Sequence, residues 1–256
     1  MYIDAHAHLD DPILAPREEE VLRAAKEAGV EVIVNASSDL PSSEASVALA
    51  ARHKEVYAVI GVHPHEAKTY CDEAERRLIA LAKEKKVVAF GEIGLDYHYD
   101  LSPRDVQKAV LEREIQLAFE LGLPVVFHVR EAYEDFNAII ERNQKYLTRG
   151  SLLHCYGGSA ELAKYYAKRL DAYFSFGGVL TFAKHKEEVL AAIGEDRLLL
   201  ETDCPYMTPV PFRGTPNEPK HIPLVAEKMA SLKGLSREKI EEITTANALR
   251  FYSIEL

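Results

Sequence analysis

Six side chains of metal-binding type stand at the ends of short apolar segments. They are His6, His8, Glu92, His128, His154 and Asp203. His6 and His8 lie two residues apart, so in an extended backbone both imidazoles project from the same face. Imidazole and carboxylate together suit zinc, manganese, iron or cobalt, and six donors exceed the number that one tetrahedral zinc needs. The pattern predicts a metal site that holds two divalent ions per chain.

The alternative for these residues is a structural network of hydrogen bonds. For His6 and His8 alone, that interpretation and a metal site are equally good. Six polar groups gathered in one place would be costly to bury without protons, partners or metal, which favours the metal site. Cys155 and Cys204 stand beside two of the donors, but we expect buried thiols there, because neighbours on a strand point to opposite sides.

Eight short runs rich in β-branched or aromatic residues divide the chain. They are Tyr2-Ile3, Glu31 to Ala36, Val56 to Val62, Val87 to Ile93, Pro124 to Val129, Ser151 to Tyr156, Tyr173 to Phe176, and Leu198 to Glu201. Between most of them lie charged segments with apolar residues three and four apart, such as Glu18 to Ala28 and Pro103 to Leu121. This spacing is typical of amphipathic helices, and Gly29 and Gly122 follow as helix caps. The alternation predicts parallel strands connected by helices.

Eight such units in about 250 residues match the usual size of a (β/α)8 TIM-type barrel. We therefore expect residues 1–256 to form one barrel domain with the metal site at the C-terminal strand ends. A doubly wound sheet is the structural alternative, but its glycine-rich phosphate turn is missing after the first run, where Asp4-Ala-His-Ala-His8 stands instead. The connection from Pro205 to Pro223 is too long for a simple turn and is expected to be a functional loop.

Composition narrows the function classes. The hydrophobic fraction of 47% is ordinary for a globular protein, and no apolar stretch is long enough for a membrane helix. The first residues lack the layout of a signal peptide, so we expect a cytoplasmic protein with reduced cysteines and no membrane contact. A net charge of -10 gives no general attraction for nucleic acid, so any such substrate must be held locally, where bound cations reverse the sign of an acidic site.

Taken together, the motifs resemble the TatD-type deoxyribonuclease family, a metal-dependent branch of the amidohydrolase-like barrels. The segments that carry the resemblance are Asp4-Ala-His-Ala-His-Leu-Asp10, Gly61-Val-His-Pro-His65, Gly91-Glu-Ile-Gly-Leu-Asp-Tyr97, Pro124-Val-Val-Phe-His-Val-Arg130, Leu153-His-Cys-Tyr-Gly-Gly158, Leu200-Glu-Thr-Asp-Cys-Pro205 and Arg213-Gly214. They cover nearly the whole chain. The resemblance implies one ion on His6, His8, Glu92 and Asp203, and a second on Glu92, His128 and His154, with Glu92 as the bridge.

Further residues are expected to act on the substrate. A two-metal site can acidify a water, and we assign Asp203 as ligand and proton acceptor, with Glu92 as the second catalytic carboxylate. His63 is the stronger substrate contact of the pair His63 and His65, although a hydrogen bond within the site is equally good for it. Arg213 and Arg130 are candidates for phosphate, with a surface ion pair as the alternative. Asp96 is expected to support a ligand.

Three functions remain open from the residues. The first is a deoxyribonuclease that acts on single strands or ends of DNA. The second is an amide or ester hydrolase such as an aminoacyl-tRNA deacylase, which the same ions could serve. The third is a metal-binding scaffold, which the long loop beside the site disfavours. No obligate protein partner is indicated. Tyr97, Tyr133, Tyr156 and Tyr206 could stack bases, but core packing explains such residues at least as often.

Overall fold

The computed structural model describes residues 1–256. Its eight strands run parallel in one sheet and follow each other in chain order from β1 to β8, with helices between them. This is the strand order of a (β/α)8 barrel, and it confirms the predicted fold class.

Each predicted apolar run overlaps one strand. The strands are β1 (Tyr2–Ala7), β2 (Val30–Ala36), β3 (Val56–Ile60), β4 (Val87–Asp96), β5 (Val125–Arg130), β6 (Ser151–Leu153), β7 (Ala172–Phe176) and β8 (Leu198–Leu200). The longest, β4, continues three residues beyond the predicted Ile93 and carries both Glu92 and Asp96. Its glycine at 94 is required by close packing, because a Cβ there would overlap the carbonyl oxygen of His128 on β5.

The helices agree with the amphipathic segments. They are α1 (Glu18–Glu27), α2 (Leu40–Arg52), α3 (Asp72–Leu81), α4 (Arg104–Leu121), α5 (Tyr133–Asn143), α6 (Ala160–Leu170), α7 (Glu187–Ala192), α8 (Ile222–Lys233) and α9 (Arg237–Tyr252). Helix α1 starts with three glutamates, which the positive end of the helix dipole favours. Asp39 caps the N-terminus of helix α2, where its carboxylate accepts the N–H of Ser42. Helix α4 ends at Gly122 in the left-handed conformation, as predicted.

The chain packs as two compact units. Unit 1 comprises residues 1–35, 158–168 and 173–256, and unit 2 comprises residues 36–157 and 169–172. That residues 1–256 form one domain therefore stays a prediction. Each unit contains its own part of the buried apolar core and its own cluster of polar strand-end residues.

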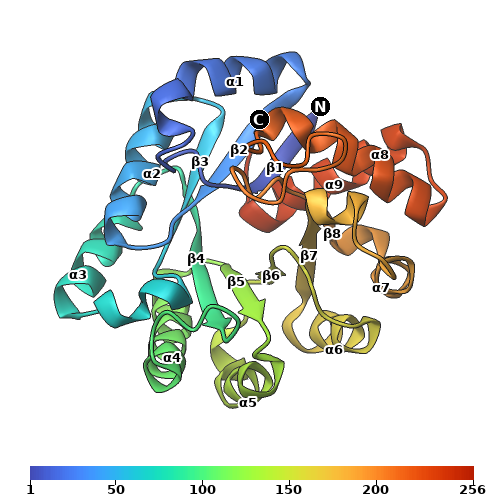
Figure 1. The fold of residues 1–256 in the computed structure, drawn as a ribbon. Helices are drawn as coiled ribbons and strands as arrows, with labels where there is room; N and C mark the ends of the chain where they lie inside the picture. Colours follow the sequence, from blue (N-terminus) through green and yellow to red (C-terminus); the bar gives the residue numbers. More distant parts are fainter. The chain divides into compact units, whose positions relative to one another are not determined.

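Unit 1 contains β1, β8 and the three C-terminal helices α7, α8 and α9. Figure 1 shows α8 and α9 side by side near β1. Helix α9 is tied to the first strand, because the Tyr252 hydroxyl donates to the carbonyl of Ala5 at 2.7 Å. The Thr245 hydroxyl donates to the carbonyl of Met1 at 2.9 Å. The last helix thus fixes the strand that carries His6.

Unit 2 contains β3 to β6 and the helices α2 to α5. In Figure 1 these helices lie on the outer side of their strands. The core between them is aromatic and aliphatic, with Phe90, Phe127 and Phe136 fully buried. The rings of Phe127 and Phe136 pack edge to face with centroids 5.0 Å apart. A rigid core of this kind holds the strand ends, and therefore their polar side chains, in place. No helix in the chain has the length and apolar character to span a membrane.

Candidate metal centre

In unit 1, His6, His8 and Asp203 come together. The Nε2 atoms of His6 and His8 lie 3.9 and 3.2 Å from Oδ1 of Asp203, and the two imidazole rings are 5.0 Å apart. His6 is fully buried, while Asp203 is 9% exposed. Three donor atoms therefore face one small volume that borders on solvent.

Backbone hydrogen bonds align this first cluster. The N–H of Asp203 donates to the carbonyl of His6 at 2.9 Å, and the N–H of His8 donates to the carbonyl of Cys204 at 2.9 Å. The end of β1 and the residues after β8 thus run beside each other. Asp203 adopts a positive φ of 54° there, an unusual backbone for a residue other than glycine. The burial of Cys204 raises the pKa of its thiol well above the ordinary value, so the neutral thiol agrees with the expectation that it is not a ligand.

Asp4 also stabilises the cluster of His6, His8 and Asp203, a role that the sequence did not reveal. Its carboxylate accepts the backbone N–H of Thr202 at 2.9 Å and also the Thr202 hydroxyl. Burial raises the pKa of Asp4 to about 8. Since Asp4 lies two residues before His6 and Thr202 lies directly before Asp203, this contact couples the two segments that carry the ligands.

In unit 2, three imidazoles converge on one carboxylate oxygen. Oε1 of Glu92 lies 2.6 Å from Nε2 of His154, 2.7 Å from Nδ1 of His128 and 3.4 Å from Nε2 of His63. Glu92 is 3% exposed and His154 is 7% exposed. Nδ1 of His128 is also only 3.2 Å from Nε2 of His154. Donor atoms this close to one another could hold a metal ion.

Asp96 sets the orientation of His128. Its Oδ2 lies 2.9 Å from Nε2 of His128 and 3.0 Å from Nε2 of His65. Burial raises the pKa of Asp96, but the hydrogen bonds from His128 and His65 outweigh it and hold the pKa well below its usual range. An ionised Asp96 takes the Nε2–H of His128 and leaves Nδ1 toward Glu92. This is the carboxylate and histidine pairing found behind many metal ligands.

His63 is a neutral hydrogen-bond donor in this arrangement. Burial lowers the pKa of His63 to about 4, although Glu92 acts in the opposite direction. Nδ1 of His63 accepts the backbone N–H of His65 at 3.1 Å, so the single proton of the neutral ring resides on Nε2. That N–H points at Glu92. The geometry therefore favours a contact to the carboxylate or to a substrate oxygen over direct coordination.

Both clusters fit a divalent cation. Ligand atoms about 2.0–2.2 Å from a zinc ion cannot be more than roughly 4.4 Å apart. The separations in unit 1, 3.2 and 3.9 Å, satisfy this limit, as do those of 2.6, 2.7 and 3.2 Å among Glu92, His128 and His154 in unit 2. The donor set of imidazole and carboxylate suits zinc, manganese, iron or cobalt. The candidate groups support metal dependence but leave open how many ions bind.

The loop after Asp203 is held in a fixed shape. The side-chain N–H groups of Asn217 donate to the carbonyls of Thr202 and Tyr206, both at 2.8 Å. Within the loop, Arg213 donates to the carbonyl of Thr208 at 3.0 Å, and its guanidinium lies 4.0 Å from the ring centre of Phe182. Arg213 is exposed and forms no ion pair, so the surface ion pair considered as its alternative is not formed. Its charge is free to meet an anion.

Arg130, at the end of β5, has the same kind of environment in unit 2. Its guanidinium lies 4.9 Å from the ring centre of Tyr99 and has no carboxylate partner. The adjacent Glu131 instead pairs with Nδ1 of His98 at 2.8 Å. Both arginines that the sequence singled out for phosphate are therefore stacked on an aromatic ring and lack a partner of opposite charge.

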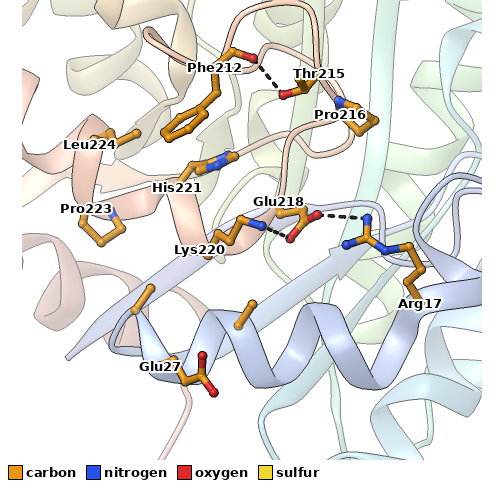
Figure 2. A pocket seen from close by; sticks show the side chains of 12 residues that line it. Arg17, Glu27, Phe212, Thr215, Pro216, Glu218, Lys220, His221, Pro223 and Leu224 are labelled. Carbon is orange, nitrogen blue, oxygen red and sulfur yellow. Dashed lines mark hydrogen bonds and ion pairs between the residues drawn. The ribbon is translucent and has the colours of Figure 1, made fainter.

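A groove on unit 1 lies apart from this chemistry. It has a volume of about 700 Å³ and is lined by α1 and by the end of the long loop. Figure 2 shows Arg17 and Lys220 on either side of Glu218, with Nζ of Lys220 2.6 Å from its carboxylate. The Phe212 and His221 rings stack 4.9 Å apart. None of the clustered ligands lines this groove.

Within the units, His6, His8 and Asp203 gather in unit 1, and Glu92, His128 and His154 gather in unit 2. That Glu92 bridges two ions stays a prediction. From the sequence, His65 was the weaker candidate for substrate contact than His63, and Tyr99 was not singled out. In the structure, His65 contacts Asp96 through a hydrogen bond. The ring centre of Tyr99 lies 5.4 Å from that of His65. The position of Tyr99 three residues beyond Asp96 was the available signal.

Comparison with known proteins agrees with the geometry. The family model described as TatD related DNase matches residues 3–253. The chain is 43% identical over 256 residues to the uncharacterized metal-dependent hydrolase YabD of Bacillus subtilis. The matched region covers 99% of this chain and 100% of YabD. It is 35% identical over 241 residues to the 3'-5' ssDNA/RNA exonuclease TatD of Cronobacter sakazakii, with 91% of each chain covered.

A solved structure gives the same result. The crystal structure of YjjV, a TatD homologue from Escherichia coli K12, superimposes with a TM-score of 0.92 at 29% identity and covers 99% of this chain and 98% of that one. Family model, relatives and fold agree over nearly the full length. The chain belongs to the TatD-related DNase family and is one of its metal-dependent hydrolases.

Proposed function

We propose that this hydrolase is a deoxyribonuclease that cleaves phosphodiester bonds at single strands or ends of DNA. The observation that carries the proposal is the convergence of His63, His128 and His154 on one oxygen of Glu92, at 2.6 to 3.4 Å, in a buried site. The naming of relatives such as the Cronobacter sakazakii exonuclease supports the choice of nucleic acid.

The proposal assigns one divalent ion to each cluster. His6, His8 and Asp203 hold the first, and Glu92, His128 and His154 hold the second. When bound, such ions supply an acidified water and a polarised phosphorus centre. Zinc, manganese and magnesium are the candidates for testing.

Residues of the chain provide the proton transfer. Asp203 lies at the solvent-facing side of its cluster, and one of its oxygens, Oδ1, faces both His8 and His6. We assign Asp203 as the group that accepts the proton of the attacking water, because a carboxylate beside the ligands is a suitable general base. His63 offers a neutral N–H for a phosphate oxygen, because its proton is fixed on Nε2 by the N–H of His65.

Two guanidinium groups favour an anionic substrate over a neutral amide or ester. Arg213 and Arg130 carry no ion pair, whereas the chain as a whole has a net charge of -10 and many carboxylates available for pairing. Phosphate oxygens match the planar donor fork of arginine. We therefore assign both arginines to phosphate groups, one in each unit.

The test is a substrate panel with metal-depleted and reloaded protein. Labelled single-stranded DNA, duplex DNA, RNA, an aminoacyl-tRNA and a small amide are each incubated with zinc, manganese or magnesium. We expect metal-dependent cleavage that is fastest on single-stranded DNA. In Asp203→Asn, cleavage should fall by about 10² to 10⁴-fold, the usual contribution of a proton acceptor.

Circular dichroism of Asp203→Asn serves as the folding control. Release of the amino acid from aminoacyl-tRNA, or turnover of the amide, with no cleavage of any nucleic acid would replace the proposal by the amide or ester alternative. Absence of turnover on every substrate and with every metal would reject enzymatic phosphodiester hydrolysis altogether.

A further inference from the structure

Tyr99 is a large aromatic side chain that remains 55% exposed although its backbone is fixed. It lies three residues after the end of β4. The backbone N–H groups of His98 and Tyr99 both donate to Oδ1 of Asp96, each at 2.9 Å. A turn held by two such hydrogen bonds presents the ring in a defined position rather than on a mobile loop.

The surroundings of the ring are polar and cationic. Its centre lies 5.4 Å from the His65 ring and 4.9 Å from the His98 ring, both nearly perpendicular to it. The guanidinium of Arg130 lies 4.9 Å from the same centre. An exposed aromatic ring beside a guanidinium offers a stacking surface and an anion-binding group at the same place.

Arg130 differs from the other stacked arginine of unit 2. Arg104 lies over the Tyr97 ring at 4.2 Å, but it also pairs with Asp100 at 3.0 Å, so its charge is neutralised. Arg130 is half-buried at the end of β5 and has no such partner. A guanidinium with five donors that pairs with no carboxylate is suited to an anion from outside the chain.

Asp96 connects this surface to the metal ligands. One of its oxygens holds the backbone of Tyr99, and the other contacts Nε2 of His128 at 2.9 Å. Nδ1 of the same histidine lies 2.7 Å from Glu92. The position of the Tyr99 ring is therefore defined relative to the site where a phosphate would be cleaved.

We propose that Tyr99 and Arg130 form a nucleotide subsite, in which the Tyr99 ring stacks on a base of a single-stranded substrate and Arg130 contacts the adjoining phosphate. The inference rests on the proposed function and names the part of the substrate that unit 2 recognises. Stacking on an aromatic ring accepts any base, because every base has a π face. A duplex end would have to fray before its base reached the ring, which explains the expected preference for single strands.

The experiment compares two fluorescent oligomers of about eight units, oligothymidylate and its abasic counterpart with the same sugar-phosphate backbone. Binding is measured by anisotropy with a chelator present, and turnover is measured with the reloaded enzyme. Tyr99→Leu should weaken thymidylate binding by roughly 5- to 150-fold, the range for loss of one stacked base, and leave the abasic oligomer unchanged. Tyr99→Phe should bind like wild type.

Arg130→Gln should instead weaken both oligomers by a similar factor, because both retain the phosphate. Phe119→Leu is the matched control, since Phe119 is 42% exposed at the end of α4 and contacts Tyr146. An equal loss for both oligomers in Tyr99→Leu, or no loss for either, would overturn the stacking role. Equal affinity of the wild type for both oligomers would do the same. Base-dependent binding without metal-dependent cleavage would keep the subsite and reject the nuclease function.

Discussion

The two ligand clusters are built by different means. In unit 1, His6, His8 and Asp203 are aligned by backbone hydrogen bonds between the end of β1 and the residues after β8. In unit 2, Glu92 and His128 are positioned by other side chains, above all by Asp96. Side-chain exposure does not divide the two clusters: it is 0% for His6, 15% for His8 and 13% for Asp203 in unit 1, and 4% for Glu92, 4% for His154 and 16% for His128 in unit 2.

This difference teaches which cluster should hold its ion more firmly. A buried site whose ligands are fixed by further hydrogen bonds loses little conformational entropy when a cation binds. The cluster of unit 2 meets this description. The cluster of unit 1 lacks a carboxylate that orients one of its imidazoles in this way, so we expect an ion bound there to exchange more readily.

The largest effect is expected from Glu92→Ala. Turnover should fall by more than the roughly 100-fold that loss of a residue supporting a ligand typically causes, since here a ligand itself is lost. Elemental analysis should show less metal, while circular dichroism remains that of the folded chain. His8→Ala is the matched change in unit 1. This variant should lose metal at a lower chelator concentration than the wild type does. Near wild-type metal content and activity in Glu92→Ala would show that Glu92 is no ligand.

Asp96→Asn tests whether side-chain support is what distinguishes unit 2. The amide can no longer keep the Nε2 proton of His128 as an ionised carboxylate does, so metal affinity and activity should each fall by about 10- to 100-fold. Titration with zinc, followed by competition with a chelator, measures the loss. The corresponding change in unit 1, Asn35→Ala, alters a residue that accepts the N–H of Leu9 and should affect metal affinity less. A larger loss of metal affinity in Asn35→Ala than in Asp96→Asn would contradict the comparison.

Arg213→Ala probes the phosphate contact assigned to unit 1. Loss of a charge-assisted contact of about 1.5 to 3 kcal/mol should lower kcat/KM on DNA by roughly ten- to hundred-fold, with bound metal unchanged. Binding should also weaken less steeply as salt rises, because one phosphate is no longer neutralised. Kinetics at several salt concentrations give both quantities. Unaltered cleavage and salt dependence would remove Arg213 from the substrate site.

The smallest effect concerns Glu114, a fully buried carboxyl on α4 that accepts the N–H of Val62 at 2.8 Å. Burial raises the pKa of Glu114 well above its ordinary value. Its stabilising contribution is therefore complete below the pKa of the unfolded chain and is lost as pH rises through the folded pKa. Glu114→Gln cannot ionise, so its free energy of unfolding should decline less as pH rises from the ordinary range of a carboxyl group into the alkaline range. Urea unfolding of both proteins at several pH values, with chelator present, provides the comparison, and parallel curves would contradict it.

The sequence was sufficient to locate the strands, and it singled out strand-end residues that the structure brings close together within each unit. His128 ends a run of apolar β-branched and aromatic residues, and in a parallel barrel such ends point to one face. The run from Ser151 to Tyr156 was predicted too long, because the strand ends at Leu153 and Cys155 adopts a positive φ of 42°. Local backbone conformation of this kind is not contained in hydrophobic periodicity.

The supporting contacts could not be obtained in the same way. That one oxygen of Asp96 meets both His65 and His128 depends on side-chain positions from β4, β5 and the loop after β3. The stacking of Arg213 on Phe182 joins residues 31 positions apart and has no regular spacing. Residue type identified these groups as candidates, whereas the partners of each group emerged only from the three-dimensional packing.

The hydrogen bond between α9 and β1 has a consequence for the nascent chain during translation. Tyr252 is synthesised 247 residues after Ala5, so the strand with His6 and His8 is made long before the hydrogen bond from Tyr252 to Ala5 can form. All ligands of unit 2 have emerged by residue 154, while Asp203 follows about 2 to 10 s later at 5–20 residues per second. During translation, therefore, the proposed ligands of unit 2 are all present in the chain before those of unit 1.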